Sequence, residues 1–230
     1  MAEKKHAQHE PDPNEVVIAK AVDFWTRYNK PIMALCAIII IVGGGYLGYK
    51  YLYKMPQEAK AAEYMYKAED YYRMDSIKLA LNGDGVNPGF LKVISKYGST
   101  TTGGLARFYA GDCYLKLNDN ANAVKYLKDF STDSKMIQAR AYKLLADAYA
   151  DMGKNGDALD FYTKAAHYFE KDDVNSPEYL FLAAYFADKV MKNSKQAIDL
   201  YKELKEKYPN TEKGFEADKY LAQLGVYKSE

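Results

Sequence analysis

A stretch of nineteen residues without a charged side chain, from Pro31 to Tyr49, constrains the fold of this chain most. As a helix rising 1.5 Å per residue it would span roughly 28 Å, close to the hydrocarbon thickness of a bilayer. Trp25 and Tyr28 precede it and tyrosines follow it, and such amphipathic rings favour the headgroup level. A soluble helix would need a polar face that this stretch lacks. We therefore predict a transmembrane helix over residues 31–53, with membrane lipid as a partner.

The segments beside the apolar stretch narrow the alternatives. Thirty residues, many of them polar, precede it, and this is too long for the n-region of a cleaved signal peptide. Apolar side chains recur at three- and four-residue steps over residues 14–30, which predicts an amphipathic helix that lies on the membrane or packs on a partner. Residues 1–13 are expected to be a disordered tail. Lysines flank the stretch on both sides, so charge alone leaves its orientation open.

Two glycines in the apolar stretch have a spacing that membrane helices use for close packing. Gly44 and Gly48 form a small-xxx-small pair, which leaves a flat strip where another helix can approach. They are our candidates for packing inside the membrane. Chance occurrence in a glycine-containing span explains the same spacing, and this alternative stays open.

A repeated pattern follows the apolar stretch. Three segments align on an alanine near the start of a helix, at Ala123, Ala158 and Ala197, with spacings of 35 and 39 residues. A period near 34 residues with paired helices is the signature of the tetratricopeptide repeat, and the chain resembles that family. The small side chains allow the two helices of a pair to approach closely. The resemblance implies an all-α, right-handed α-solenoid, which follows the single predicted transmembrane helix.

The repeat domain is predicted to cover residues 54–230. The repeat pattern is irregular at two places. A loop over residues 82–88 interrupts the first repeat, and in the last repeat Tyr185 and Asp188 replace a small residue and a tyrosine. The expected elements are repeats at about 57–98, 104–136, 139–171 and 178–210, and a capping helix at 211–225.

The composition argues against several classes of function. Lys and Arg total 32 and Asp and Glu total 31, without a long block of one sign, which disfavours nucleic-acid binding. The three histidines and the two cysteines, Cys36 and Cys113, show no metal-ligand spacing. No phosphate-binding loop, nucleophile motif or paired-carboxylate arrangement emerges. We therefore expect no enzyme activity, no cofactor, no metal and no small-molecule substrate.

A candidate protein-binding groove follows from the tetratricopeptide resemblance, because the first helix of each pair lines the concave face in that family. The matching positions are Leu105, Phe108, Asp112, Arg140, Lys143, Asp147, Tyr179, Leu182 and Phe186. Apolar ends with charges between them suit an extended or helical polypeptide. On this interpretation, aspartate at both Phe108 and Phe186 abolishes partner binding and leaves the helix content intact. The alternative, that Phe108, Leu182 and Phe186 pack against neighbouring helices, stays open.

The order of the segments resembles the ancillary SecYEG translocon subunit family over nearly the whole chain. The resemblance rests on residues 14–25, on residues 44–53 at the end of the span, and on the repeats that follow. It implies a bacterial inner-membrane protein with a cytoplasmic N-terminus, periplasmic repeats, and SecYEG and a membrane-anchored periplasmic peptidyl-prolyl isomerase as partners. Such a subunit assists secreted or envelope proteins as a scaffold or chaperone. The alternatives are a static scaffold of another envelope complex, in outer-membrane biogenesis or cell division, and an adaptor facing the cytoplasm.

Overall fold

The computed structural model describes residues 13–227. These residues divide into two compact units, one ending at Pro56 and one beginning at Gln57. Helices build both units, so the predicted all-α class is confirmed. The tail expected at residues 1–13 lies outside the described residues except for its last position.

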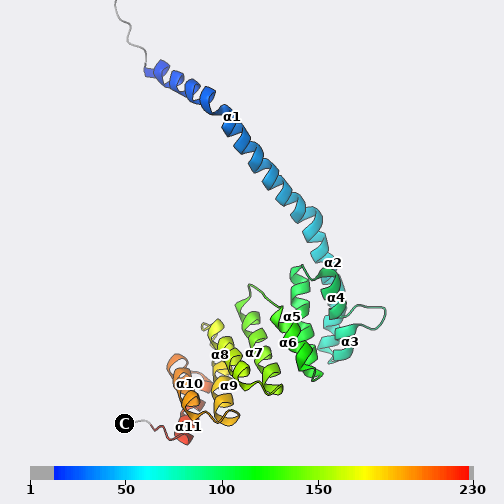
Figure 1. Ribbon diagram of the computed structural model, residues 1–230, viewed down its shortest axis with the longest axis vertical. Helices are drawn as coiled ribbons and strands as arrows, with labels where there is room; N and C mark the ends of the chain where they lie inside the picture. Colours follow the sequence, from blue (N-terminus) through cyan, green and yellow to red (C-terminus); the bar gives the residue numbers. More distant parts are fainter. Residues whose placement is uncertain (1–12, 228–230) are drawn as a thin grey trace, which may run out of the picture. The chain divides into compact units, whose positions relative to one another are not determined.

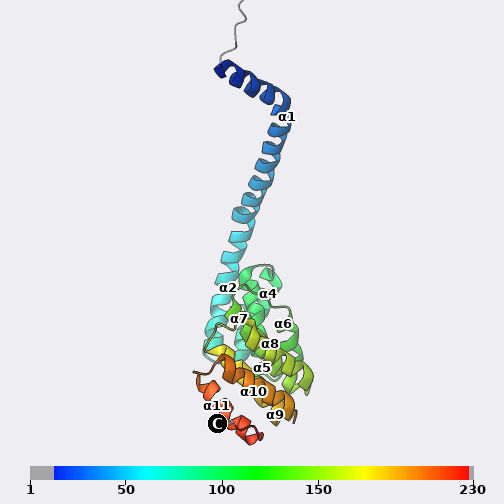
Figure 2. The same cartoon turned by 90° about the vertical axis from the view of Figure 1, so that its left-hand side faces the viewer.

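The described part of the first unit contains α1 (Pro13–Gly48), a short π-helix, η1 (Tyr49–Lys54), and the first two residues of the next helix. Pro31 lies inside α1, so the amphipathic and apolar segments belong to one helix. A proline inside a helix removes a backbone hydrogen bond and favours a bend, and Figure 2 shows α1 bent along its length. Within residues 13–227, the helical stretch Val16–Arg73 is long and apolar enough to cross a membrane, with a mean hydropathy of 2.1 in its most apolar window and none of that window buried.

The second unit is a row of helices joined by turns (Figure 1). From α3 onward each helix packs on the next, and α5 and α9 also contact α7 and α11, respectively, so helical hairpins stack into a solenoid. The helices are α2 (Met55–Arg73), α3 (Ile77–Asn82), α4 (Phe90–Tyr97), α5 (Thr101–Lys116), α6 (Asn120–Lys128), α7 (Lys135–Asp151), α8 (Asn155–Tyr168), α9 (Asn175–Lys189), α10 (Ser194–Lys207) and α11 (Glu212–Gln223).

One kind of turn joins the two helices of successive hairpins. A residue in the left-handed conformation follows the first helix, and the next residue donates its backbone N–H to a carbonyl near the end of that helix. This arrangement satisfies a carbonyl that the helix leaves without a partner. The left-handed residues are Asp75, Asn118, Gly153 and Lys192, with φ of 55°, 60°, 70° and 56°. The turn after α2 therefore has the geometry of the later turns, and α2 with α3 begins a hairpin like the others.

Close approach within a hairpin depends on small side chains. On α5, a Cβ added at Gly111 would lie 2.4 Å from Cγ of Leu127 on α6. Ala146 on α7 and Ala158 on α8 have no exposed surface. Interiors are packed closely enough that a larger side chain at such a position would separate the helices.

A carboxylate from α2 caps the N-terminus of α5. The two Glu58 side-chain oxygens accept the backbone N–H groups of Thr101 at 2.8 Å and Thr102 at 2.7 Å. The Thr102 hydroxyl donates to the same carboxylate at 2.5 Å. A helix N-terminus carries orphan N–H donors and favours negative charge. This contact therefore joins α2 to the hairpin that follows it.

The same local structure ends the first and last hairpins. In each, a threonine hydroxyl donates to a tyrosine carbonyl three residues earlier and accepts the backbone N–H of a glycine three residues later. The two sets are Tyr97, Thr100 and Gly103, and Tyr208, Thr211 and Gly214. A Cβ at either glycine would lie 2.0 Å or less from the tyrosine carbonyl oxygen. Glycine is therefore required at these two positions, where the chain leaves the first and the last hairpin.

Candidate protein-binding groove

A hollow with a volume of about 550 Å³ opens along the second unit, and we call it the central groove. Its walls come mainly from α5 and α7, the first helices of two successive hairpins, with one residue each from α2 and α9. The lining residues are Tyr72, Asp112, Leu115, Lys116, Arg140, Lys143, Leu144, Asp147, Asp151 and Tyr179.

The structure divides the nine predicted groove residues into two groups. The polar members and one tyrosine line the central groove together, namely Asp112, Arg140, Lys143, Asp147 and Tyr179. The apolar members lie elsewhere. Phe108 and Phe186 are 6% and 7% exposed and belong to the hydrophobic core, and Leu182 packs against that core. Leu105 lines a separate hollow at the N-terminal end of α5.

The burial of the two phenylalanines corrects one sequence-based expectation. Phe108 contacts the ring of Phe130, with the ring centres 5.4 Å apart, and Phe186 contacts Tyr162 at 5.5 Å. Aspartate at these positions would place carboxylates inside the core rather than in a groove. The helix content is therefore not expected to survive the double substitution.

Asp112, at one end of the central groove, is held by groups from two helices. The hydroxyl of Tyr72 on α2 donates a hydrogen bond to Asp112 Oδ2. Lys116 Nζ lies 3.9 Å from the same oxygen and 4.3 Å from the centre of the Tyr72 ring. Burial, together with the Asp112 hydrogen bond, raises the pKa of Tyr72. The phenol therefore stays a protonated donor, and this carboxylate is already engaged.

Asp147, farther along the groove, is engaged in the same way. Lys143 Nζ donates to Asp147 Oδ2 at 2.7 Å, and the Tyr162 hydroxyl donates to Oδ1 at 2.7 Å. Burial raises the pKa of Tyr162, and the negative charge of Asp147 adds to the effect. The Lys143 ammonium and the Asp147 carboxylate therefore already have bonding partners within the chain.

Arg140 differs from the other cations of the groove, because no ion pair joins it to another residue within 13–227. Its guanidinium carbon lies 5.8 Å from the centre of the Phe108 ring. Burial raises the pKa of the neighbouring Tyr179, and the positive charge of Arg140 opposes that increase. A guanidinium offers planar, forked donors that match a carboxylate. The groove can therefore attract a carboxylate to Arg140.

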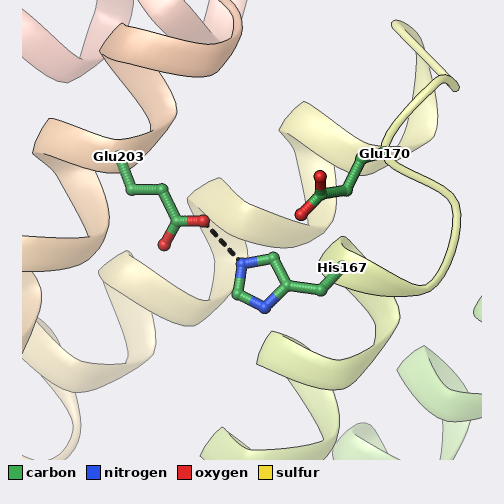
Figure 3. Close-up of side chains that lie close together, drawn as sticks. All are labelled: His167, Glu170 and Glu203. Atoms are coloured by element: carbon green, nitrogen blue, oxygen red, sulfur yellow. Dashed lines mark hydrogen bonds and ion pairs between the residues drawn. The ribbon is translucent and has the colours of Figure 1, made fainter.

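A second cluster joins α8 to α10, and Figure 3 shows its three side chains. One ligand atom from each of His167, Glu170 and Glu203 lies within 4.8 Å of the others, and His167 Nε2 is 2.7 Å from Glu203. Lys207 Nζ lies 2.7 Å from Glu170 and 3.0 Å from Glu203. The hydrogen bond from Lys207 lowers the pKa of Glu170. The lysine ammonium thus supplies the positive charge between the carboxylates, and the cluster is an ion-pair network between helices.

The remaining candidates lie in the first unit, where a Cβ at Gly44 or Gly48 would meet no atom within 4 Å. Their strip is open, and packing against another membrane helix stays a prediction.

Cys36 is exposed and Cys113 is buried, and both are free. Burial raises the pKa of the Cys113 thiol to about 12, so this side chain stays a protonated part of the core.

Comparison with known families identifies the repeats. The sequence model of the tetratricopeptide repeat matches residues 105–133 and 178–211, which correspond to the hairpins α5–α6 and α9–α10. No curated protein matches the chain. Tetratricopeptide repeats are generally non-catalytic modules of protein–protein interaction, so the second unit contains a protein-interaction scaffold.

Proposed function

We propose that this chain is a membrane-anchored, protein-binding accessory subunit of the bacterial Sec translocon, which assists secreted or envelope proteins as a scaffold or chaperone. The observation that carries the proposal is the central groove, whose Arg140 has no ion-pair partner within residues 13–227. Tetratricopeptide repeats form this groove, and the same chain contains a helix apolar enough to cross a membrane. The resemblance of residues 14–25 and 44–53, with the repeats that follow, to the ancillary translocon subunits supports the translocon over other envelope complexes.

The proposed arrangement assigns a task to each segment. Residues 31–53 contain the anchor, which lies in the inner membrane. The N-terminus is in the cytoplasm, and the repeats, from residue 54, are in the periplasm. Gly44 and Gly48 pack against another membrane helix, and the central groove binds an extended or helical polypeptide through Arg140. SecYEG and a membrane-anchored periplasmic peptidyl-prolyl isomerase are the proposed partners.

Co-purification from mild detergent tests the translocon assignment. We expect SecY and the isomerase to be recovered with the tagged full-length protein. Replacing Arg140 by glutamate should lower recovery of the isomerase at least about tenfold, because a carboxylate-binding cation becomes a repelling charge. The matched control is Lys171→Glu, at an exposed lysine outside the groove, which should leave recovery unchanged. Recovery of cell-division or outer-membrane assembly proteins without SecY would instead support the static scaffold.

Protease digestion of intact spheroplasts tests the proposed orientation. We expect external protease to degrade the repeats, while an epitope tag placed before residue 13 is protected by the membrane. The tag should become sensitive only after detergent is added. A protected repeat domain with a degraded tag would reverse the orientation and would favour an adaptor facing the cytoplasm.

A further inference from the structure

The second helix of the first hairpin is split in two. In the last hairpin, α10 runs without interruption from its left-handed turn to the closing tyrosine, and sixteen positions separate Lys192 from Tyr208. In the first hairpin, twenty-two positions separate Asp75 from Tyr97, and α3 and α4 share this distance. The first hairpin therefore contains six additional residues.

Burial locates the additional residues. In the last hairpin, the side chains five, nine, twelve and sixteen positions after the turn are all buried. In the first hairpin, a buried side chain also lies five positions after the turn. Buried side chains lie at the other three positions if the six additional residues before Phe90 are left out of the count. The two sets are Ala197, Tyr201, Leu204 and Tyr208, and Ala80, Phe90, Val93 and Tyr97. The addition thus lies between α3 and α4, and we call residues 83–89 the insertion loop.

Hydrogen bonds hold the insertion loop in one conformation. Asp84 Oδ1 accepts the backbone N–H groups of Val86 at 2.9 Å and Asn87 at 2.5 Å. The hydroxyl of Tyr71 on α2 donates to Asp84 Oδ2 at 2.6 Å and fixes the loop to the helix. Figure 1 shows this loop projecting beside α3 and α4. Val86 is 90% exposed, so the loop presents an apolar side chain that the core does not use.

A hollow of about 510 Å³ lies between the insertion loop, α2 and α4. Lys67, Lys92 and Lys96 contribute three positive charges to its lining, and Glu63 contributes the single carboxylate. The Lys96 ammonium lies 5.1 Å from the centre of the Tyr64 ring, and Lys67 lies over Tyr71. None of the three lysines forms an ion pair within residues 13–227. The lining therefore has a net positive charge, three ammonium groups against the Glu63 carboxylate, beside the exposed Val86 side chain. The Asp84 carboxylate of the loop is engaged by Tyr71 and by the loop backbone.

We propose that the insertion loop and this hollow form a second docking surface, which binds an acidic segment of a partner protein. Carboxylates of the segment would lie against the three ammonium groups, and an apolar side chain next to them would contact Val86 and Pro88. Opposite charges attract a partner and fix its register on the surface. This surface is separate from the central groove and does not depend on what that groove binds.

A peptide titration tests the proposal with the full-length protein in phosphatidylcholine nanodiscs. The probe is a fluorescent peptide of glutamates around one leucine, and binding is followed by anisotropy at low salt. We expect Lys92→Glu with Lys96→Glu to weaken binding at least about tenfold, and deletion of residues 84–89 to have a similar effect with an unchanged helical spectrum. Lys92→Gln with Lys96→Gln should give an intermediate loss. Binding should also weaken as salt is added.

The matched control reverses charge at two exposed lysines outside the hollow, Lys171→Glu with Lys195→Glu, and should bind the peptide as the unmodified chain does. Each variant is also titrated in an Arg140→Glu background, because Arg140 of the central groove would otherwise bind the same acidic peptide. Unchanged binding after charge reversal at Lys92 and Lys96 in that background would overturn the proposal. Binding of short-chain phosphatidylglycerol but not of the peptide would show a lipid surface and would overturn it as well.

Discussion

Alanine in place of Gly103 is expected to lower the free energy of unfolding by about 2–4 kcal/mol. The new Cβ would lie 1.9 Å from the carbonyl oxygen and 2.6 Å from the carbonyl carbon of Tyr97. Both are backbone atoms, so no side-chain rotation relieves the overlap. The start of α5 would have to move away from α4, and the hydrogen bonds of Thr100 would be lost. Thermal unfolding followed by circular dichroism should show a Tm lower by roughly 5–15 °C.

The adjacent residue provides a matched control. Gly104 also lies inside α5, but a Cβ there would meet no atom within 4 Å. Alanine in a helix interior is more favourable than glycine by up to about 1 kcal/mol, so Gly104→Ala should raise the Tm slightly. Gly214→Ala should resemble Gly103→Ala, because its Cβ would lie 2.0 Å from the Tyr208 carbonyl oxygen. Equal effects at Gly103 and Gly104 would show that the backbone overlap is not the cause.

The class of fold could be predicted because its requirements recur at fixed intervals. Ala123, Ala158 and Ala197 mark the places where two helices meet, and all three are fully buried. A helix pair tolerates only small side chains there, so the sequence shows the period directly. The turns are less visible. Gly153 suggests a left-handed turn, whereas Asp75 and Lys192 adopt the same conformation without a glycine to indicate it.

The first hairpin was harder to recognise because six additional residues displace its pattern. One signal survives the displacement. The spacing of tyrosine, threonine and glycine at Tyr97, Thr100 and Gly103 recurs 111 residues later, from Tyr208 to Gly214. The loop expected over residues 82–88 coincides with the insertion between α3 and α4.

The groove could be predicted only in part, because repeat positions indicate a helix face and not which neighbour that face meets. Tyr72 was missed because it comes from α2, upstream of the clearest repeats, although its hydroxyl holds Asp112. Phe108 lies one helical turn before Asp112, yet its ring turns into the core against Phe130. His167 and Glu203 are 36 residues apart, and only the packing of α8 near α10 brings them together. Such contacts depend on the rotation of each helix, which the period does not specify.

Aspartate at both Phe108 and Phe186 is expected to unfold the repeat domain. Loss of a buried phenylalanine side chain costs about 3–5 kcal/mol, and an unpaired buried carboxylate adds a further penalty. Two such sites approach or exceed the total stability of a typical domain, which is about 5–15 kcal/mol. Circular dichroism of the full-length variant should show loss of most of the helical signal from the second unit, with the unfolding transition absent.

A comparison with Arg140→Glu separates unfolding of the core from loss of partner binding at the central groove. This substitution also introduces a carboxylate near Phe108, but at an exposed side chain, and it should retain the helical signal. Loss of partner binding in Arg140→Glu, with folding intact, would then be due to the groove alone. Should the double aspartate variant keep its helical signal and its unfolding transition, the two rings would not belong to the core. They would then be available to a bound polypeptide as anchors at the two ends of the groove.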